Sequence, residues 1–130
     1  MPQLAVAQTS EQLVRQAESA YNARNYSQAE AIWRRVIQSN PSNVVAYIKL
    51  GDARRNQGKF DEAIATYRQA IQLDPNNPKA YNNMGLALYS QKKFDEAIVA
   101  YRRAIEIEPN ALRYNLSLIH ISEPTRPLYI

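Results

Sequence analysis

The sequence predicts an all-α fold, a solenoid of three antiparallel helix-turn-helix units. The segment FDEAIATYRQAIQLDP at 60–75 returns 34 residues later as FDEAIVAYRRAIEIEP at 94–109, and a looser copy, YSQAEAIWRRVIQSNP, lies at 26–41. Each period contains two stretches whose apolar residues recur at helical spacing. The chain has only three glycines, seven prolines and 45% hydrophobic residues, which is typical of a mostly helical protein. Because so short a unit cannot bury a core alone, the units must stack.

The composition excludes several classes of protein. A chain of 130 residues forms one domain or one short repeat array. The absence of cysteine excludes disulfides and thiolate zinc sites. No apolar run approaches the ~20 residues that a membrane-spanning helix needs, so we expect no membrane span. The 16 basic and 12 acidic residues, with a net charge of +4, are spread along the chain. This mixing is typical of a solvated helical surface.

The first eight residues are expected to form a disordered leader. Within it, Ala5-Val6-Ala7-Gln8 resembles the small-residue end of a signal-peptide cleavage region, but no basic and no long apolar region precedes it. Two interpretations remain open. Either this is a simple leader, and the chain as written is cytoplasmic, or the start is misplaced and the parent protein is exported.

The repeat array is expected over residues 9–111, in units 10–43, 44–77 and 78–111. Thr9 and Gln12 form a capping-box pattern that opens the first helix. Asn77 followed by Pro78 is an N-cap with proline at the first helical position. Paired acids at 61–62 and 95–96 favour the positive ends of the second helices of their units. The second helices should end before prolines, at Pro41, Pro75 and Pro109.

The turns and the mid-helix glycines carry further predictions. Gly58 suits a left-handed helix end, whereas Arg24 and Lys92 hold the same position in the other units, whose turns should be slightly strained or differently built. Glycine inside a helix costs ~1 kcal/mol relative to alanine, which is tolerable where it lets a neighbouring helix approach closely. We therefore expect Gly51 and Gly85 to face a closely packed second helix. The side chains expected to fill that contact, and to be nearly buried, are Ala63, Ala97, Tyr67 and Tyr101.

This pattern resembles the tetratricopeptide repeat family over about residues 9–111. The second unit supplies Tyr47, Leu50, Gly51, Ala63, Tyr67, Ala70 and Pro75 at the family's consensus positions. The third supplies Tyr81, Met84, Gly85, Ala97, Tyr101, Ala104 and Pro109, and the first is divergent, with Leu13, Gln16, Ala17, Ala29, Trp33, Val36 and Pro41. The resemblance implies a right-handed superhelix whose first helices line a concave groove that binds proteins.

Residues of this groove should lie on the face of each first helix opposite its core stripe. The candidate residues are Lys49, Asp52, Arg55, Asn56, Lys79, Asn82, Asn83, Leu86 and Tyr89, and the same rule places Ile48 there. Mixed polar and apolar side chains suit an extended peptide or a partner helix, and the nearly balanced charge favours a mixed-charge peptide. The simpler interpretation is that these residues only face water.

One known use within the family can be tested against the residues. Chaperone adaptors that resemble this fold grip an acidic C-terminal peptide with a clamp of Lys, Asn, Asn, Lys and Arg. At those positions this sequence has Val14, Glu18, Lys49, Lys79 and Asn83, of which only Lys79 matches. We therefore expect no two-carboxylate clamp for heat-shock chaperone tails.

Other functions have weaker support in the sequence. With no cysteine, a single histidine at His120 and no glycine-rich phosphate loop, we expect no enzyme, no cofactor and no metal. Nucleic-acid binding would depend on basic pairs at 34–35, 54–55, 92–93 and 102–103, which do not share one face. A further alternative is a purely structural docking arm of a larger effector protein.

Residues 112–130 are expected to hold the truncated start of a fourth repeat and a non-native tail. NALRYN at 110–115 resembles NNPKAYNN at 76–83, whereas Leu116–Arg126 can be back-translated into a sequencing adapter. The last second helix would then lack the next helix of a longer array. We expect this uncapped end to offer a route to oligomers.

Overall fold

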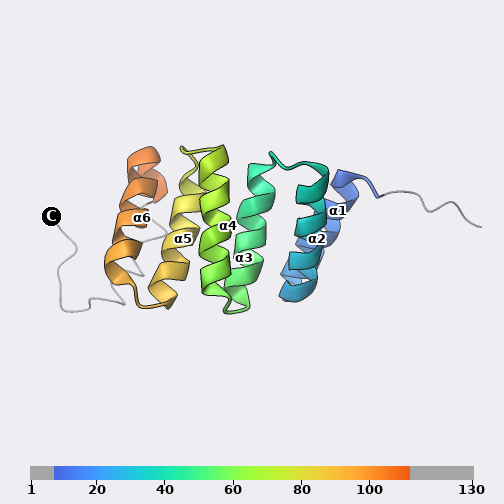
Figure 1. Cartoon of the computed structure of the whole chain (residues 1–130), viewed down its shortest axis with the longest axis horizontal. Helices are drawn as coiled ribbons and strands as arrows, with labels where there is room; N and C mark the ends of the chain where they lie inside the picture. The colour runs from blue at the N-terminus through green and yellow to red at the C-terminus, as the bar shows by residue number, and fades with distance from the viewer. Residues whose placement is uncertain (1–7, 112–130) are drawn as a thin grey trace, which may run out of the picture.

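The computed structural model describes residues 8–111, and this part of the chain is all-α. Figure 1 shows the helices side by side in chain order along the long axis, with the first and the last at opposite ends. Their bounds are α1 (Ser10–Asn22), α2 (Tyr26–Ser39), α3 (Val44–Asn56), α4 (Phe60–Leu73), α5 (Pro78–Ser90) and α6 (Phe94–Ile107), followed by the short 3-10 helix η1 (Pro109–Ala111). The predicted all-α fold class is confirmed.

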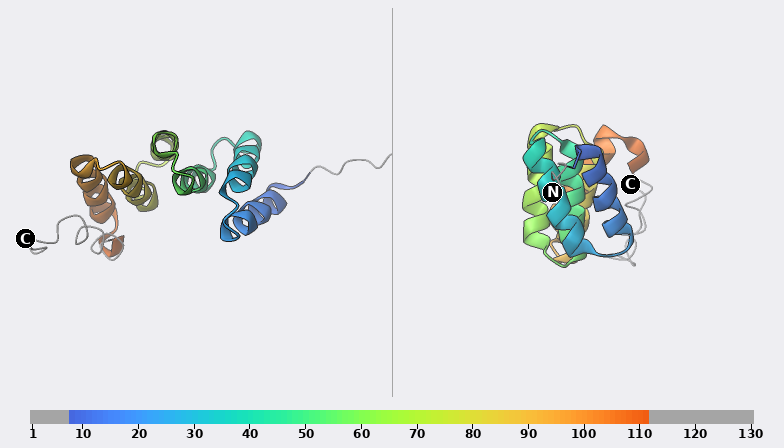
Figure 2. Two further views of the ribbon diagram at one scale, coloured as in Figure 1. Left: turned by 90° about the horizontal axis from the view of Figure 1, so that it is seen from below. Right: turned by 90° about the vertical axis from the view of Figure 1, so that its right-hand side faces the viewer.

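The helices form three antiparallel pairs that stack as a solenoid. Helix α1 packs on α2, α3 on α4 and α5 on α6, while α2 against α3 and α4 against α5 join one pair to the next. Figure 2 shows that successive pairs are rotated relative to one another, so the array twists along its length. Among residues 8–111, no helix is long and apolar enough to cross a membrane.

The helix ends follow the predicted signals. The Thr9 hydroxyl accepts a hydrogen bond from the Gln12 amide at 3.1 Å, and the Gln12 side chain accepts one from the Thr9 amide at 3.0 Å. Asn77 caps α5 through its side-chain oxygen, with Pro78 at the first turn. Helices α2, α4 and α6 end two residues before the prolines expected to stop them. Local sequence therefore sets these helix ends.

The three turns within the pairs have left-handed backbone. Gly58 has a φ of 79°, and Arg24 and Lys92, at the equivalent positions, have φ values of 64° and 63°. The strain expected at the two non-glycine turns is thus present, because a side chain at positive φ crowds its own backbone.

The core depends on the close approach predicted at the mid-helix glycines. A Cβ atom added to Gly51 would lie 2.5 Å from Cε1 of Tyr67, and one added to Gly85 would lie 2.5 Å from Cε1 of Tyr101. Both tyrosines are at most 2% exposed. Two apolar clusters result, one from α1 to α3 and one from α3 to α6, so α3 contributes to both. Helix α3 is therefore buried on more than one side.

Two predictions lie outside the described residues. The expected leader covers 1–8, of which only Gln8 is described. The expected start of a fourth repeat and its tail cover 112–130.

Candidate functional site

Hydrogen bonds join the first helices of the three units along one side of the array. We call this side, formed by α1, α3 and α5, the inner groove, after the groove expected from the sequence. Asn56 of α3 donates a hydrogen bond from Nδ2 to the Tyr21 hydroxyl of α1 at 2.8 Å. Asn83 of α5 donates from Nδ2 to Oδ1 of Asp52 on α3 at 2.9 Å. Helices α3 and α5 also contact each other directly. Polar side chains thus link the three first helices in series.

Asp52 is the centre of this hydrogen-bonded chain. Its Oδ1 also accepts a hydrogen bond from the Tyr67 hydroxyl at 2.6 Å, and Nη2 of Arg55 lies 3.6 Å away. The Tyr67 hydroxyl in turn accepts a hydrogen bond from Nε of Arg55 at 3.2 Å. Burial raises the pKa of Asp52, while the Tyr67 and Asn83 hydrogen bonds and the Arg55 charge oppose that rise. We call Asp52, Arg55, Tyr67 and Asn83 the Asp52 brace.

The prediction that Asp52 lies on a face turned away from the core is wrong. Its residue is only 7% exposed, and Ile48, which the same helical rule placed in the groove, is 4% exposed and packs in the core. The reason is that α5 covers the middle of α3 from the groove side. Because Asp52 and the half-buried Arg55 bind each other and Tyr67, their polar atoms are largely used within the protein.

The other predicted groove residues remain accessible in different degrees. Asn56 and Lys79 are exposed, and the half-buried members are Lys49, Asn82, Asn83, Leu86 and Tyr89. Asn82 donates a hydrogen bond from Nδ2 to Oδ1 of Asn83 at 3.2 Å. The buried Oδ1 of Asn82 has no hydrogen-bond partner among the described residues. Four predicted residues therefore lie together on α5, and one of them, Asn83, belongs to the Asp52 brace.

The third unit replaces this brace with apolar and aromatic side chains. Leu86 and Tyr89 stand 34 residues after Asp52 and Arg55. Tyr101, the counterpart of Tyr67, is buried, and its hydroxyl finds no partner within residues 8–111. The ring of Tyr89 meets that of Phe94 edge-on at 5.3 Å between centroids. The groove is thus polar along α3 and more apolar along α5.

Sequence reasoning missed the hydroxyls of Tyr21, Tyr67 and Tyr101 as parts of this surface. Tyr21 is at a groove position, and Tyr67 and Tyr101 are at core positions. The neighbouring residues in the sequence do not indicate that these hydroxyls make polar contacts. A comparison at the 34-residue offset contained the signal, because Asp52 has no acidic counterpart in the third unit.

The basic pairs considered for nucleic-acid binding do not form one patch. Arg54 pairs with Glu30 at 2.9 Å, and Arg55 belongs to the Asp52 brace. The exposed pairs 34–35 and 102–103 lie on α2 and α6, which are separated along the array (Figure 1). Within residues 8–111, no group of His, Asp and Glu side chains is arranged to hold a metal ion.

Solved structures with the same fold include one domain bound to a peptide. The first TPR domain of Spaghetti (RPAP3), bound to the HSP90 peptide SRMEEVD, is 25% identical with a TM-score of 0.81, covering 92% of this chain and 94% of that one. The Arabidopsis OM64 TPR domain shares the fold at 23% identity and a TM-score of 0.79, covering 87% and 95%.

MamA proteins form a second group of structural neighbours. A MamA crystal structure is 27% identical with a TM-score of 0.72, covering 82% of this chain and 62% of that one. The chain spans 59% of the length of MamA from MSR-1. A comparison with curated proteins gives no significant match.

Family models match each of the three units. A TPR repeat model matches residues 51–92, and two tetratricopeptide repeat models match residues 78–111 and 13–43. Between Leu13 and Ala111, the region in which the helix pairs stack, the matches leave only residues 44–50 uncovered. The chain therefore belongs to the tetratricopeptide repeat family.

Proposed function

We propose that the array is a protein-interaction module that binds an extended segment of a partner along the inner groove. The observation that carries this is the group of half-buried side chains on α5, Asn82, Asn83, Leu86 and Tyr89, next to the Asp52 brace. The peptide complex of the RPAP3 domain supports a role in protein binding in general terms.

The chemistry of the α5 side chains suits an extended backbone. A side-chain amide can donate to a carbonyl and accept from an N–H, and the buried Oδ1 of Asn82 is an acceptor without a partner among the described residues. Leu86 and Tyr89 add apolar area beside it. The hydrogen bond from Asn83 to Asp52 fixes one amide before any ligand arrives, which lowers the entropy cost of binding.

The charges along the groove indicate the partner's polarity. Because Asp52 and Arg55 offset each other, Lys49 and Lys79 dominate the part formed by α3 and α5. Helix α1 contributes Glu11 and Glu18 against Arg15. The expected ligand is therefore a mixed-charge peptide with its acidic residues over α3 and α5. Micromolar affinity is expected for a surface of three repeats.

The test is a peptide-display library selected on the full chain, followed by fluorescence anisotropy with the best peptide. Replacing Asn82 and Tyr89 by alanine should weaken binding about tenfold or more, because each removes about one hydrogen bond or one buried ring face. Thermal stability should stay close to that of the parent. Arg102→Ala with Arg103→Ala, on the exposed side of α6, is the matched control and should bind normally.

Two results would contradict the proposal. Binding that survives the α5 changes but depends on Arg102 and Arg103 would place the partner on the outer helices. A library that yields no peptide at all would favour the purely structural docking arm.

A further inference from the structure

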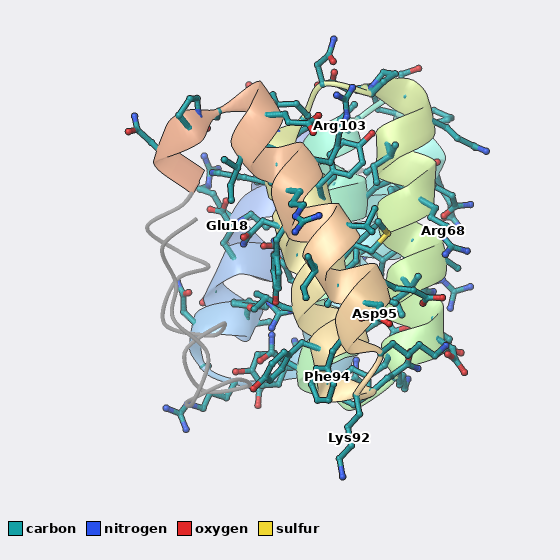
Figure 3. The ribbon with its side chains drawn as sticks, turned by 90° about the vertical axis from the view of Figure 1, so that its left-hand side faces the viewer. Glu18, Arg68, Lys92, Phe94, Asp95 and Arg103 are labelled. Carbon is teal, nitrogen blue, oxygen red and sulfur yellow. The ribbon has the colours of Figure 1, made fainter. Side chains whose placement is uncertain are left out.

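A cleft of about 430 Å³ lies between α4 and α6 on the side of the array away from the inner groove, and we call it the outer cleft. Residues Tyr81, Met84 and Leu88 of α5 form its floor. Arg68 of α4 stands on one wall, and Val99 and Arg103 of α6 stand on the other. Figure 3 looks onto α6 and shows Arg68 on the opposite side of the molecule from Glu18 of α1. The outer cleft is therefore separate from the proposed peptide groove.

The equivalent cleft one repeat earlier, of about 510 Å³, is lined by polar groups that contact one another. Arg54 donates a hydrogen bond from Nε to Glu30 of α2 at 2.9 Å and another from Nη1 to Thr66 of α4 at 2.7 Å. Lys59 adds a third contact to Glu30 at 3.1 Å. These side chains link α2, α3 and α4, so their polar groups are occupied within the protein.

The outer cleft has lost three of these four polar side chains. Thirty-four residues after Glu30, Arg54 and Thr66 stand Ile64, Leu88 and Ala100. No polar bridge between α4 and α6 takes their place among the described residues. Val99 is 66% exposed on the wall, although it is a large apolar residue. The surface of this cleft is thus apolar where the corresponding surface of the preceding repeat is polar.

Two arginines flank this apolar surface. Arg68 has no ion pair within residues 8–111, and Arg103 lies over the Tyr81 ring at 5.8 Å while contacting Glu106 at 3.2 Å. Guanidinium groups bind carboxylates with two parallel hydrogen bonds. Glu96 also lines the outer cleft and disfavours a second acid beside it.

We propose that the outer cleft is a second docking site, for a partner peptide that carries a large apolar side chain next to a carboxylate. The apolar side chain packs on Met84, Leu88 and Val99, and the carboxylate binds Arg68 and Arg103. The volume of the cleft is that of a small-ligand pocket, far below the surface that a stable dimer of this chain would bury. A nucleic-acid phosphate would gain nothing from the apolar floor.

The experiment uses the full chain, labelled for NMR, and synthetic peptides of about ten residues. The first peptide has one Leu flanked by Glu in a Gly-Ser background. The second has Leu replaced by Ala, and the third has Glu replaced by Lys. Chemical-shift changes at Met84, Val99 and Ala100 should appear with the first peptide only, because the second lacks the anchor and the third is repelled by the arginines.

Two variants locate the site. Val99→Glu places a negative charge on the exposed wall and should abolish the shifts. Arg68→Gln with Arg103→Gln should weaken binding about tenfold or more, because it removes both charged donors. Asn82→Ala with Tyr89→Ala changes the inner groove alone and should leave this binding unchanged. Circular dichroism verifies that each variant keeps its fold, as expected for the exposed Arg68, Val99 and Arg103 and for the half-buried Asn82 and Tyr89.

The following outcomes would overturn the proposal. Shifts confined to α1, α3 and the groove side of α5 would assign the peptide to the inner groove. Equal binding of the lysine peptide would remove the role of the arginines. Self-association in sedimentation that Val99→Glu abolishes would identify a second copy of the chain as the occupant, and tighter binding of single-stranded RNA to the same residues would identify nucleic acid.

Discussion

Tyr67 and Tyr101 stand at equivalent positions, but only the first has its hydroxyl paired. Tyr67 donates to Asp52 at 2.6 Å, whereas the Tyr101 hydroxyl has no partner among the described residues. Tyr67→Phe should lower the free energy of unfolding by ~1–3 kcal/mol, because it leaves a buried carboxylate short of a donor. Tyr101→Phe should change it by less than ~0.5 kcal/mol or stabilise the protein. Urea unfolding of the two variants measures the difference.

The two substitutions control for each other, since each removes one oxygen from a buried ring behind a mid-helix glycine. Equal losses in the two variants would show that the Asp52 brace adds nothing to stability. That result would also weaken the claim that Asn83 is fixed before a ligand binds.

The left-handed turn at Lys92 should be improvable by glycine. A side chain at a φ of 63° costs ~1–2 kcal/mol of strain, which glycine relieves. Glycine in turn loses more backbone entropy on folding, which offsets ~0.5–1 kcal/mol of that gain. Lys92→Gly should therefore raise the free energy of unfolding by up to ~1 kcal/mol, measured by thermal or urea unfolding. Lys93→Gly, with a φ of −89°, relieves no strain and should be neutral or destabilising.

For individual residues, the sequence predicted backbone conformation and core packing better than it predicted polar contacts. The strain at Arg24 and Lys92 and the approach of Tyr67 to Gly51 followed from residue type and repeat position. The burial of Asp52 did not, because a carboxylate opposite the core stripe is exposed unless another helix covers it. Here α5 covers it, which depends on how one repeat is rotated on the next.

At the scale of the elements, Glu30 of α2 holds the turn between α3 and α4 through Arg54, Gln57 and Lys59. Burial alone would raise the pKa of Glu30, but these hydrogen bonds outweigh it and lower the pKa to about 2, from an ordinary 4.5. A lowered folded pKa stabilises the protein fully above pH 4.5 and loses that contribution as the pH falls towards 2.

Glu30→Gln should therefore flatten the dependence of stability on pH between 4.5 and 2, as measured by urea unfolding across that range. Asp52 acts with the opposite sign, since its raised pKa favours protonation in the folded state. It cannot be the source of the acid loss. If Glu30→Gln loses stability with acid as steeply as the parent, the ion pairs of Glu30 contribute little.

The same elements show why the outer cleft was not foreseen. The sequences of helices α4 and α6 are almost identical, and this similarity identified the repeat. The difference between a polar cleft and an apolar one depends on three positions, where Glu30, Arg54 and Thr66 are replaced by Ile64, Leu88 and Ala100. A repeat pattern is recognised by the residues that recur in each unit. The surfaces that distinguish one unit from the next depend on the residues that differ.

For the whole molecule, a fold similar to that of the RPAP3 domain does not imply binding of the same ligand. That domain was solved with the HSP90 peptide SRMEEVD. We expect no binding of SRMEEVD to this chain up to ~1 mM by fluorescence anisotropy, because Val14 and Glu18 replace cationic and amide positions of the clamp. Glu18 would repel the terminal carboxylate.

A gain-of-function variant makes this prediction sharper. Val14→Lys, Glu18→Asn and Lys49→Asn together restore three clamp positions and leave Asn83, which holds Asp52, in place. Measurable binding of SRMEEVD to this triple variant is expected, and amidation of the peptide's C-terminus should abolish it. Tight binding to the parent chain would show that the clamp positions were aligned wrongly.

Helix α3 is a wall shared by both apolar clusters, with Ile48 in one and Ala46, Leu50 and Ala53 in the other. Neighbouring pairs in a stacked array are coupled only to each other. A molecule stretched between its two ends should therefore lengthen in steps. One terminal pair should separate from its neighbour before the rest of the array unfolds, so the stretched molecule should pass through an intermediate length.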